Sequence, residues 1–368
     1  MTATVRSLLG TFNPQPMDID TNPTLSSKQW TEDFPPFEQQ YVRVWAPTVS
    51  AVEEFLGPGR DTPSGADGVG LETVAHVLNT YPQVVSSEGD VTRDFDQNII
   101  VPVALAFSGH SAWSSPSPGV QAVPGAPTLW SRSLVGAKRV SSSTRTVDYQ
   151  MTMSHVERSL ERPAMIGEMK KPRVIRRKEW TFEEEASGTT IRLAQELRAY
   201  ACEYRCPQVF VFDMKTLVLV QFRALRVEDI SAEDCPVDIC VIPRDYDPNI
   251  PDQCTMQFAL YRLAWRGWVR LCATLECRED RRPGEYVRVP THLNHGGLTR
   301  KYEYWSGTPI WVDHYGRQYL AHPSGCRRDF VYRSRPRPNG TAETQGFWVW
   351  RSQDGLIEDT PNAFISGY

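Results

Sequence analysis

Two short apolar runs near the middle of the chain are separated by a polar connection. The first is Val147–Met153, and the second begins at Pro163, just before a cluster of charged residues. Runs of this length predict two neighbouring strands, although methionine-rich runs are also compatible with buried helix. In strand geometry Glu168 and Lys170 point to the same face of the sheet. If the two strands pair, Asp148 reaches the same edge, and we expect two carboxylates and an ammonium group to meet there.

The pattern downstream predicts a helix, a hairpin and a second, longer helix. Thr189–Tyr204 carries its apolar residues near one face, which is typical of an amphipathic helix. Gln208–Asp213 and Thr216–Phe222 follow as two apolar strands with a tight connection, which predicts a hairpin. Residues 228–252 are acidic and proline-rich, and are interpreted as a loop. Gln253–Leu271 is apolar nearly all round and predicts a helix buried against the sheet.

The pattern upstream predicts one core helix followed by a long loop. Val91–Phe107 is the expected helix, and Pro102 near its middle should kink or divide it. Residues 109–127 are rich in serine, proline and glycine, which indicates a loop. Strands over 129–135 and 139–143 would then lead into the two central strands. Together these segments predict a meander of three antiparallel strands.

Length and composition allow one enlarged domain or two. The chain has 368 residues, of which 40% are hydrophobic, and this is enough for a sizeable core. Residues 1–35 are polar and proline-rich, and we expect a flexible tail there. A single α/β domain is predicted over 36–280, with its core at roughly 85–275. The aromatic residues of 281–368 alternate with glycine and proline, which predicts a β-rich C-terminal extension.

Several classes of protein are excluded by what the sequence lacks. No run approaches about eighteen apolar residues, and no basic segment followed by an apolar one opens the chain, so neither a membrane span nor a secretory signal is expected. The eight cysteines contain no C-x-x-C pair, which favours reduced thiols in an intracellular protein, nuclear or cytoplasmic. Dinucleotide-binding, Walker, serine-hydrolase and zincin motifs are absent, which argues against those chemistries.

The charged cluster expected at the sheet edge has the composition of a magnesium site. Mg²⁺ prefers oxygen ligands, keeps several waters and takes only one or two protein carboxylates. Asp148 and Glu168 would supply the carboxylates, and Lys170 could orient a water molecule and offset charge on a phosphate. Mn²⁺ is the alternative ion.

The spacing of these residues resembles that of the PD-(D/E)XK nuclease superfamily. Asp148 is followed, after nineteen residues, by Glu168-Met169-Lys170, and the predicted helix and strand come next. The superfamily core runs helix, three strands, helix, strand. Val147 stands where the name has proline, and the surrounding sequence is similar to predicted members from fungal genomes. The resemblance implies a restriction-endonuclease-like mixed sheet flanked by helices, hydrolysis of phosphodiesters with Lys170 positioning the water, and the Met169 carbonyl as a third metal ligand.

The resemblance also implies further polar residues at the site. Gln195 on the predicted helix is the best placed to reach the reactive edge, with Tyr204 further along, although a solvent-facing glutamine is the alternative. The superfamily often places an additional acid on the first core helix, and Asp94 or Asp96 could serve. The alternative is that both are surface acids near a helix start, where the helix dipole favours them.

A basic run follows the expected metal ligands directly. After Lys170 it contains Lys171, Arg173, Arg176, Arg177 and Lys178. Such a run would hold a phosphate backbone next to the reactive centre, because attraction and ion release scale with the number of neutralised phosphates. A nuclear-targeting signal and a solvated loop are the alternatives. The predicted partner is therefore nucleic acid, with DNA favoured over RNA.

Three interpretations of function remain open from the sequence. The leading one is a metal-dependent nuclease. The second is a catalytically silent protein that keeps the fold and binds nucleic acid or a protein partner. In the third, the E-x-K triplet is an ordinary salt-bridged strand of an unrelated fold. The intact Asp/Glu/Lys set favours the enzyme, because a binding module has no need to keep carboxylates that repel each other.

Overall fold

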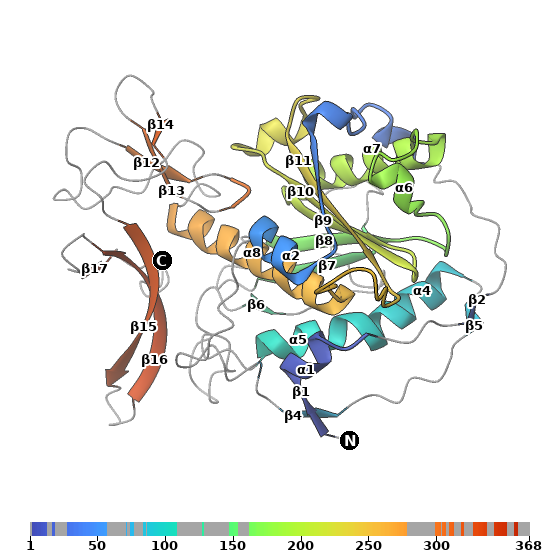
Figure 1. Cartoon of the computed structure of the whole chain (residues 1–368). Helices are drawn as coiled ribbons and strands as arrows, with labels where there is room; N and C mark the ends of the chain where they lie inside the picture. Colours follow the sequence, from blue (N-terminus) through green and yellow to red (C-terminus); the bar gives the residue numbers. More distant parts are fainter. Residues whose placement is uncertain are drawn as a thin grey trace.

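The structure is a computed structural model (Figure 1). It describes residues 2–12, 17–18, 28–56, 71, 74–76, 84–85, 87–108, 127–128, 147–153, 162–277, 299–302, 304–306, 309–312, 318–319, 327–336, 342–351 and 357–359.

The centre of the structure is a seven-stranded mixed β-sheet. Its strands, in spatial order, are β3 (Val42–Trp45), β11 (Val237–Pro243), β10 (Thr216–Phe222), β9 (Gln208–Phe212), β8 (Arg162–Met169), β7 (Tyr149–Met153) and β6 (Pro127–Thr128). Parallel pairing joins β8 to β9 and β11 to β3, and the other neighbours are antiparallel. The described part of the chain therefore has a mixed α/β architecture.

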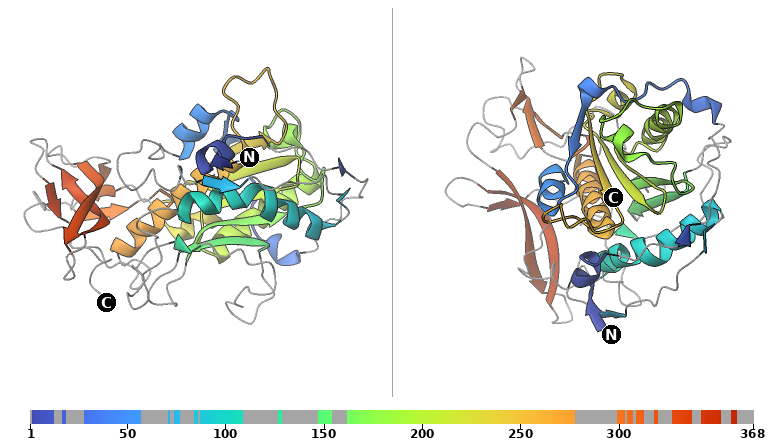
Figure 2. Two further views of the ribbon diagram at one scale, coloured as in Figure 1. Left: turned by 90° about the horizontal axis from the view of Figure 1, so that it is seen from below. Right: turned by 45° about the vertical axis from the view of Figure 1, so that its right-hand side comes forward.

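Helices cover both faces of this sheet, as the views in Figures 1 and 2 show. The helix α7 (Gly188–Glu203) lies on one face, and α8 (Met256–Cys277) lies on the other beside a long helical segment. Side chains along each strand alternate between the two layers, as a period of two requires. Met165 and Met169 of β8 pack in the core under α8, whereas Ile166 packs in the core under α7. Two hydrophobic cores result, one on each side of the sheet.

The long helical segment consists of α4 (Glu88–Asp94), the π-helix η3 (Phe95–Ile100) and α5 (Val101–Ser108). It confirms the predicted core helix, and the irregular turn comes just before Pro102, where the sequence predicted a disturbance. Proline has no N–H and cannot bond the carbonyl of Asn98, four residues earlier. Gln257 of α8 donates to that carbonyl instead, at 3.5 Å.

Close packing fixes α8 against the strand that carries Glu168. A Cβ atom on Gly267 would lie 1.9 Å from the carbonyl oxygen of Ala164, so only glycine permits this approach. The buried guanidinium of Arg270 donates to the Pro163 carbonyl at 2.6 Å and to Gln208 Oε1 at 2.7 Å. The helix and the two strands β8 and β9 therefore form one rigid layer beneath the candidate site.

The elements predicted downstream of Glu168 are confirmed, with one exception. β9 and β10 form the expected hairpin, and α7 and α8 are the two expected helices. The interpretation of 228–252 as a loop is wrong, because it contains β11 and most of the 3₁₀-helix η5 (Val227–Ser231). Every residue of β11 is buried. The apolar run of this strand was obscured by the acids and prolines around it. The strands expected over 129–135 and 139–143 lie outside the described residues, as do residues 109–126 of the expected loop.

Parts of the expected flexible tail over 1–35 pack against the folded core. α1 (Val5–Leu9) buries its first and last residues in the core under α8. The 3₁₀-helices η1 (Gln29–Thr31) and η2 (Gln39–Tyr41) lead into β3 and then into α2 (Val49–Leu56). The prediction failed here because a segment with few apolar residues can still pack against the core. Each of those residues has only to fill a gap between elements that are distant in sequence.

The remaining elements are short or lie beyond α8. β1 (Thr2–Thr4) pairs with β4 (Val74–His76), β2 (Met17–Asp18) pairs with β5 (Val84–Val85), and α6 (Arg177–Trp180) is a single turn. Two three-stranded antiparallel sheets follow α8. The first consists of β12 (Thr299–Tyr302), β13 (Pro309–Val312) and β14 (Gln318–Tyr319). The second consists of β15 (Arg327–Pro336), β16 (Ala342–Arg351) and β17 (Ile357–Asp359). None of the predicted site residues lies in the two sheets that follow α8.

Candidate active site at the end of strand β8

The pairing of β7 with β8 brings the predicted carboxylates together. Tyr149 lies opposite Gly167 in the antiparallel register, so the next position on each strand places Asp148 opposite Glu168. The backbone N–H of Met169 donates to Asp148 Oδ2 at 2.8 Å, which fixes that carboxylate at the end of β8. The sequence-based expectation that these residues share one edge matches the geometry.

Lys170 and Glu168 form a close ion pair on the α7 side of the sheet. The Lys170 ammonium lies 2.7 Å from Glu168 Oε1, as side chains two apart on a strand allow. A second carboxylate, that of Glu196 on α7, lies 3.1 Å from the same ammonium. The Glu168 and Glu196 side chains are 3% and 1% exposed, so their charges depend on partners within the protein.

A second lysine reaches the same carboxylates from the amino-terminal segment. The ammonium of Lys28 lies 3.0 Å from Glu168 Oε1 and 2.6 Å from Glu196 Oε1, and it also donates to the Tyr200 hydroxyl. Tyr200 in turn donates to Glu196 Oε1 at 3.0 Å. We call this group the lysine–carboxylate cluster, and its members are Lys28, Asp148, Glu168, Lys170, Glu196 and Tyr200.

Sequence reasoning missed three members of the cluster. Glu196 and Tyr200 are four residues apart and therefore share one face of α7. Glu196 stands between the buried Leu193 and Leu197 in the sequence of α7. A carboxylate among apolar positions of a helix is the signal that could have identified it. Lys28 gave no signal, because it lies in a polar segment far from the other members in sequence.

The structure does not bring Gln195 into the cluster. Its amide donates to the carbonyls of Phe34 at 2.9 Å and Glu32 at 3.4 Å, so it holds the amino-terminal segment against α7. Tyr204 lies nearer, because its hydroxyl accepts the N–H of Val147 at 3.3 Å, immediately before Asp148. On this geometry Gln195 supports the segment that carries Lys28 and lies outside the cluster, whereas its neighbour Glu196 lies within it.

Burial and the charges of neighbouring groups oppose each other at the lysines and glutamates of the cluster, and burial prevails only at Glu168. Burial raises the pKa of Glu168 to about 7; Lys170 opposes that rise, and Asp148 and Glu196 add to it. Burial would lower the pKa of Lys170 and of Lys28, but the carboxylates of Glu168 and Glu196 outweigh it and raise both. Burial would raise the pKa of Glu196, yet the two lysines lower it. Of the two buried glutamates, Glu168 is therefore the one whose pKa is raised.

The cluster offers oxygen ligands that fit a divalent cation. Within the described part of the chain, Glu168 Oε2 is buried and has no hydrogen-bond partner. Asp148 is close enough that its charge helps to raise the pKa of Glu168. Among the described residues, no group of three or more His, Cys, Asp or Glu side chains is arranged to hold a metal ion. The donor set is thus a pair of carboxylates, which suits Mg²⁺ with several retained waters.

The acids of the first core helix lie on the other side of the sheet. The Asp94 carboxylate accepts two hydrogen bonds from the guanidinium of Arg244, at 2.6 and 3.0 Å, and both side chains are buried. Burial raises the pKa of Asp96. Burial, with the charge of Asp96 beside it, raises the pKa of Tyr149, whose ring packs in the core under α8. The arrangement therefore gives no support to Asp94 or Asp96 as an additional ligand.

The basic run leaves the end of β8 through a tight turn and lies at the surface. Arg173 adopts a left-handed backbone with φ of 71°, and the Asp213 carboxylate then accepts the Ile175 N–H at 3.0 Å. Burial raises the pKa of Asp213 to about 6, although its hydrogen bonds oppose the rise. The run is thereby fixed beside the β9–β10 turn.

Arg176, Arg177 and Lys178 of the run contact other groups of the protein. Arg176 contacts Glu179 at 3.1 Å, and Lys178 contacts Glu184 at 3.1 Å. Arg177 donates to the Thr216 hydroxyl at 3.1 Å and to the Lys215 carbonyl at 3.2 Å. Lys171 and Arg173 follow Lys170 most closely and are the members nearest to the cluster in sequence.

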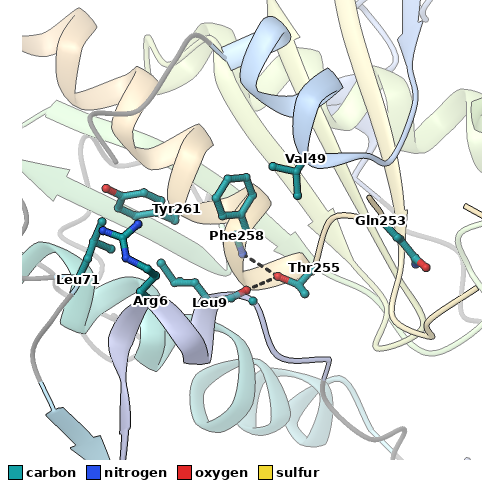
Figure 3. A pocket seen from close by; sticks show the side chains of 9 residues that line it. Arg6, Leu9, Val49, Leu71, Gln253, Thr255, Phe258 and Tyr261 are labelled. Atoms are coloured by element: carbon teal, nitrogen blue, oxygen red, sulfur yellow. Dashed lines mark hydrogen bonds between the residues drawn. The ribbon is translucent and has the colours of Figure 1, made fainter. Parts of the chain in front are cut away.

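A separate pocket of about 260 Å³ lies between α1, α2 and α8 (Figure 3). Apolar and aromatic side chains such as Leu9, Val49 and Phe258 line it together with polar ones, which are those of Arg6, Gln253 and Thr255. The Thr255 hydroxyl donates to the Leu9 carbonyl and accepts the Phe258 N–H, so these polar groups serve the packing of the helices. The pocket contains no member of the lysine–carboxylate cluster.

Comparisons with protein family models, with curated proteins and with solved structures find no match for this chain. None of the helices in the described ranges combines the length and the apolar character needed to span a membrane.

Proposed function

We propose that this protein is a divalent-metal-dependent nuclease with a restriction-endonuclease-like core. The order of its elements supports the proposal, because a long helical segment, the strands β6, β7 and β8, the helix α7 and the strand β9 follow one another along the chain. The superfamily core has the same order.

The meeting of Asp148, Glu168 and Lys170 carries the proposal. A buried carboxylate oxygen without a donor costs about 1–3 kcal/mol or more, and a cation at Glu168 Oε2 would remove that cost. Asp148 and Glu168 would hold Mg²⁺ or Mn²⁺, with the Met169 carbonyl as a third ligand. When bound, such an ion supplies a Lewis acid and lowers the pKa of water.

Lys170 would act on the reacting phosphate. Two carboxylates fix its ammonium, at 2.7 and 3.1 Å, so the positive charge is already oriented in a buried site. A fixed charge of this kind stabilises negative charge that builds up on a phosphate during hydrolysis. Glu196 is in this scheme a positioning residue, because it acts through Lys170, and Tyr200 orients Glu196.

The basic run would bind the nucleic-acid backbone, with DNA favoured over RNA as the substrate. Lys171 and Arg173 continue directly from Lys170, and Arg176, Arg177 and Lys178 extend the positive surface. Phosphate contacts position a nucleic acid without reading its sequence. Lys171 and Arg173 follow Lys170 most closely in the sequence, so we expect these two residues to contribute most.

Cleavage of DNA and RNA, single- and double-stranded, in Mn²⁺ and in Mg²⁺ tests the proposal. We expect turnover in the wild type that Lys170→Met abolishes with little change in affinity, whereas the exposed Glu228→Gln serves as a matched control. Replacing Lys171 and Arg173 by glutamine should weaken binding and flatten its salt dependence.

The second candidate is a catalytically silent protein that keeps the fold to bind nucleic acid. It is favoured by one observation: two ammonium groups already contact Glu168 Oε1, at 2.7 and 3.0 Å. A wild type that shows no divalent-dependent cleavage of any of these substrates, but whose binding still depends on the basic run, would establish this candidate instead.

A further inference from the structure

The amino-terminal segment from Lys28 to Tyr41 is held firmly along α7, and Figures 1 and 2 show the two side by side. Gln195 donates to the carbonyls of Glu32 and Phe34, and Arg198 donates to that of Pro36 at 3.4 Å. The rings of Trp30 and Tyr200 lie 5.8 Å apart. These contacts place Lys28 beside the cluster, at the end of a docked segment.

Lys28 differs from Lys170 in how it enters the cluster. Lys170 continues β8, and its side chain is only 10% exposed. The hydrogen bonds and ion pairs of Lys28 with the cluster are made by its ammonium, and its side chain is 34% exposed. Its ammonium can therefore leave for solvent without disturbing the sheet, whereas that of Lys170 cannot.

The charges of Glu168 and Glu196 are already balanced without a metal ion. Two ammonium groups face the carboxylates of Glu168 and Glu196, and only Asp148 adds a further negative charge. A divalent cation at Asp148 and Glu168 would stand close to both ammonium groups, on a carboxylate that they share. Like charges a few ångströms apart in a buried site repel strongly.

We propose that Lys28 is an internal competitor for the divalent cation, and that metal binding requires its ammonium to leave Glu168. The amino-terminal segment then regulates the site: while Lys28 is in place the cluster is held metal-free, and its withdrawal opens Glu168 to the ion. This inference rests on the metal site of the proposed function.

The test is a calorimetric titration of the full-length protein with Mn²⁺ alone. We expect Lys28→Met to bind Mn²⁺ about tenfold or more tightly than the wild type, because one positive charge has been removed from the site. Lys28→Arg keeps the charge and should bind like the wild type. Arg192→Met removes an exposed positive charge of α7 that lies outside the cluster, and it should also leave the affinity unchanged.

A second variant guards against misfolding of Lys28→Met. Lys28→Gln removes the same positive charge but keeps a polar side chain that can hydrogen-bond to Glu196, so it should also bind Mn²⁺ more tightly than the wild type. Equal or weaker binding by the folded Lys28 variants that lack the positive charge, in a wild type that does bind Mn²⁺, would overturn the competitor role and leave the metal site standing. If neither the wild type nor any Lys28 variant binds Mn²⁺, both this inference and the metal site of the proposed function fail.

Discussion

The ammonium of Lys28 lies 2.6 Å from Glu196 Oε1, and that of Lys170 lies 3.1 Å from Glu196 Oε2. Glu196 therefore bridges two lysines that come from distant parts of the chain. Like charges can stay this close in a buried site only where carboxylates lie between them. Removal of the bridge would leave both ammonium groups dependent on Glu168.

Glu196→Gln should destabilise the protein by about 3–5 kcal/mol, because loss of one partner from a buried ion pair leaves an uncompensated charge. Urea unfolding measures the change, with the exposed Glu185→Gln as a control expected to stay within about 0.5 kcal/mol of the wild type. Adding Lys28→Met to Glu196→Gln should recover part of the loss, since one unpaired ammonium is removed. A double variant that is as unstable as the sum of its single changes would show that the two side chains are not coupled.

Mg²⁺ or Mn²⁺ should raise the melting temperature of the wild type but not that of Asp148→Ala, which lacks one of the two carboxylates. Mass action makes the measurement sensitive, since an ion at a hundred times its dissociation constant stabilises the folded state by about 2.7 kcal/mol. Asp245→Ala, at an exposed position, is the matched control. Equal shifts in the wild type and in Asp148→Ala would remove Asp148 from the metal site.

The sequence could predict those parts of the site that depend on the regular alternation of side chains along a strand. Glu168 and Lys170 share a face because a strand has a period of two, and Asp148 joins them because neighbouring apolar runs paired as expected. The hairpin of β9 and β10 was predictable for the same reason.

The parts that the sequence could not predict depend on contacts between distant segments. Lys28 contacts Glu168, which lies 140 residues later in the sequence, and no feature of the residues around Lys28 identifies it as a site residue. The choice of Gln195 over Glu196 was an error of about 100° around the helix axis, because adjacent residues on a helix face different directions. β11 was missed because its apolar run is short and lies among acids and prolines.

Gly267→Ala should destabilise the protein, because the new methyl group would lie 1.9 Å from the Ala164 carbonyl oxygen, and backbone on both sides would have to move. Overpacking of this kind typically costs about 1–3 kcal/mol. Gly188→Ala is a matched control: it stands at the start of α7 with no atom within 4 Å of its added carbon, and it should be neutral or slightly stabilising. Similar unfolding free energies for the two variants would contradict the close approach of α8 to β8.

Glu179 is a buried carboxylate that ties the basic run to the start of α7. Its Oε2 accepts hydrogen bonds from the Ser187 N–H at 2.9 Å and from the Ser187 and Thr190 hydroxyls at 2.6 Å each. Its Oε1 accepts one from Arg176 at 3.1 Å. Burial alone would raise the pKa of Glu179, but these hydrogen bonds outweigh it and lower the pKa to about 2.

A carboxylate with a depressed pKa in the folded state contributes stability above its ordinary pKa of 4.5 and loses it as the pH falls towards 2. Glu179→Gln should therefore destabilise the protein near neutral pH by about 1.5–3 kcal/mol, the usual contribution of hydrogen bonds to a charged group. The difference between the variant and the wild type should shrink as the pH is lowered from about 5 to about 2.5, because the wild-type carboxylate becomes protonated when the chain unfolds. Urea unfolding at several pH values measures this difference, and Glu185→Gln, exposed on the same connection, should show none. A difference that stays constant over the whole range would mean that the Glu179 contacts stabilise the fold without regard to its charge.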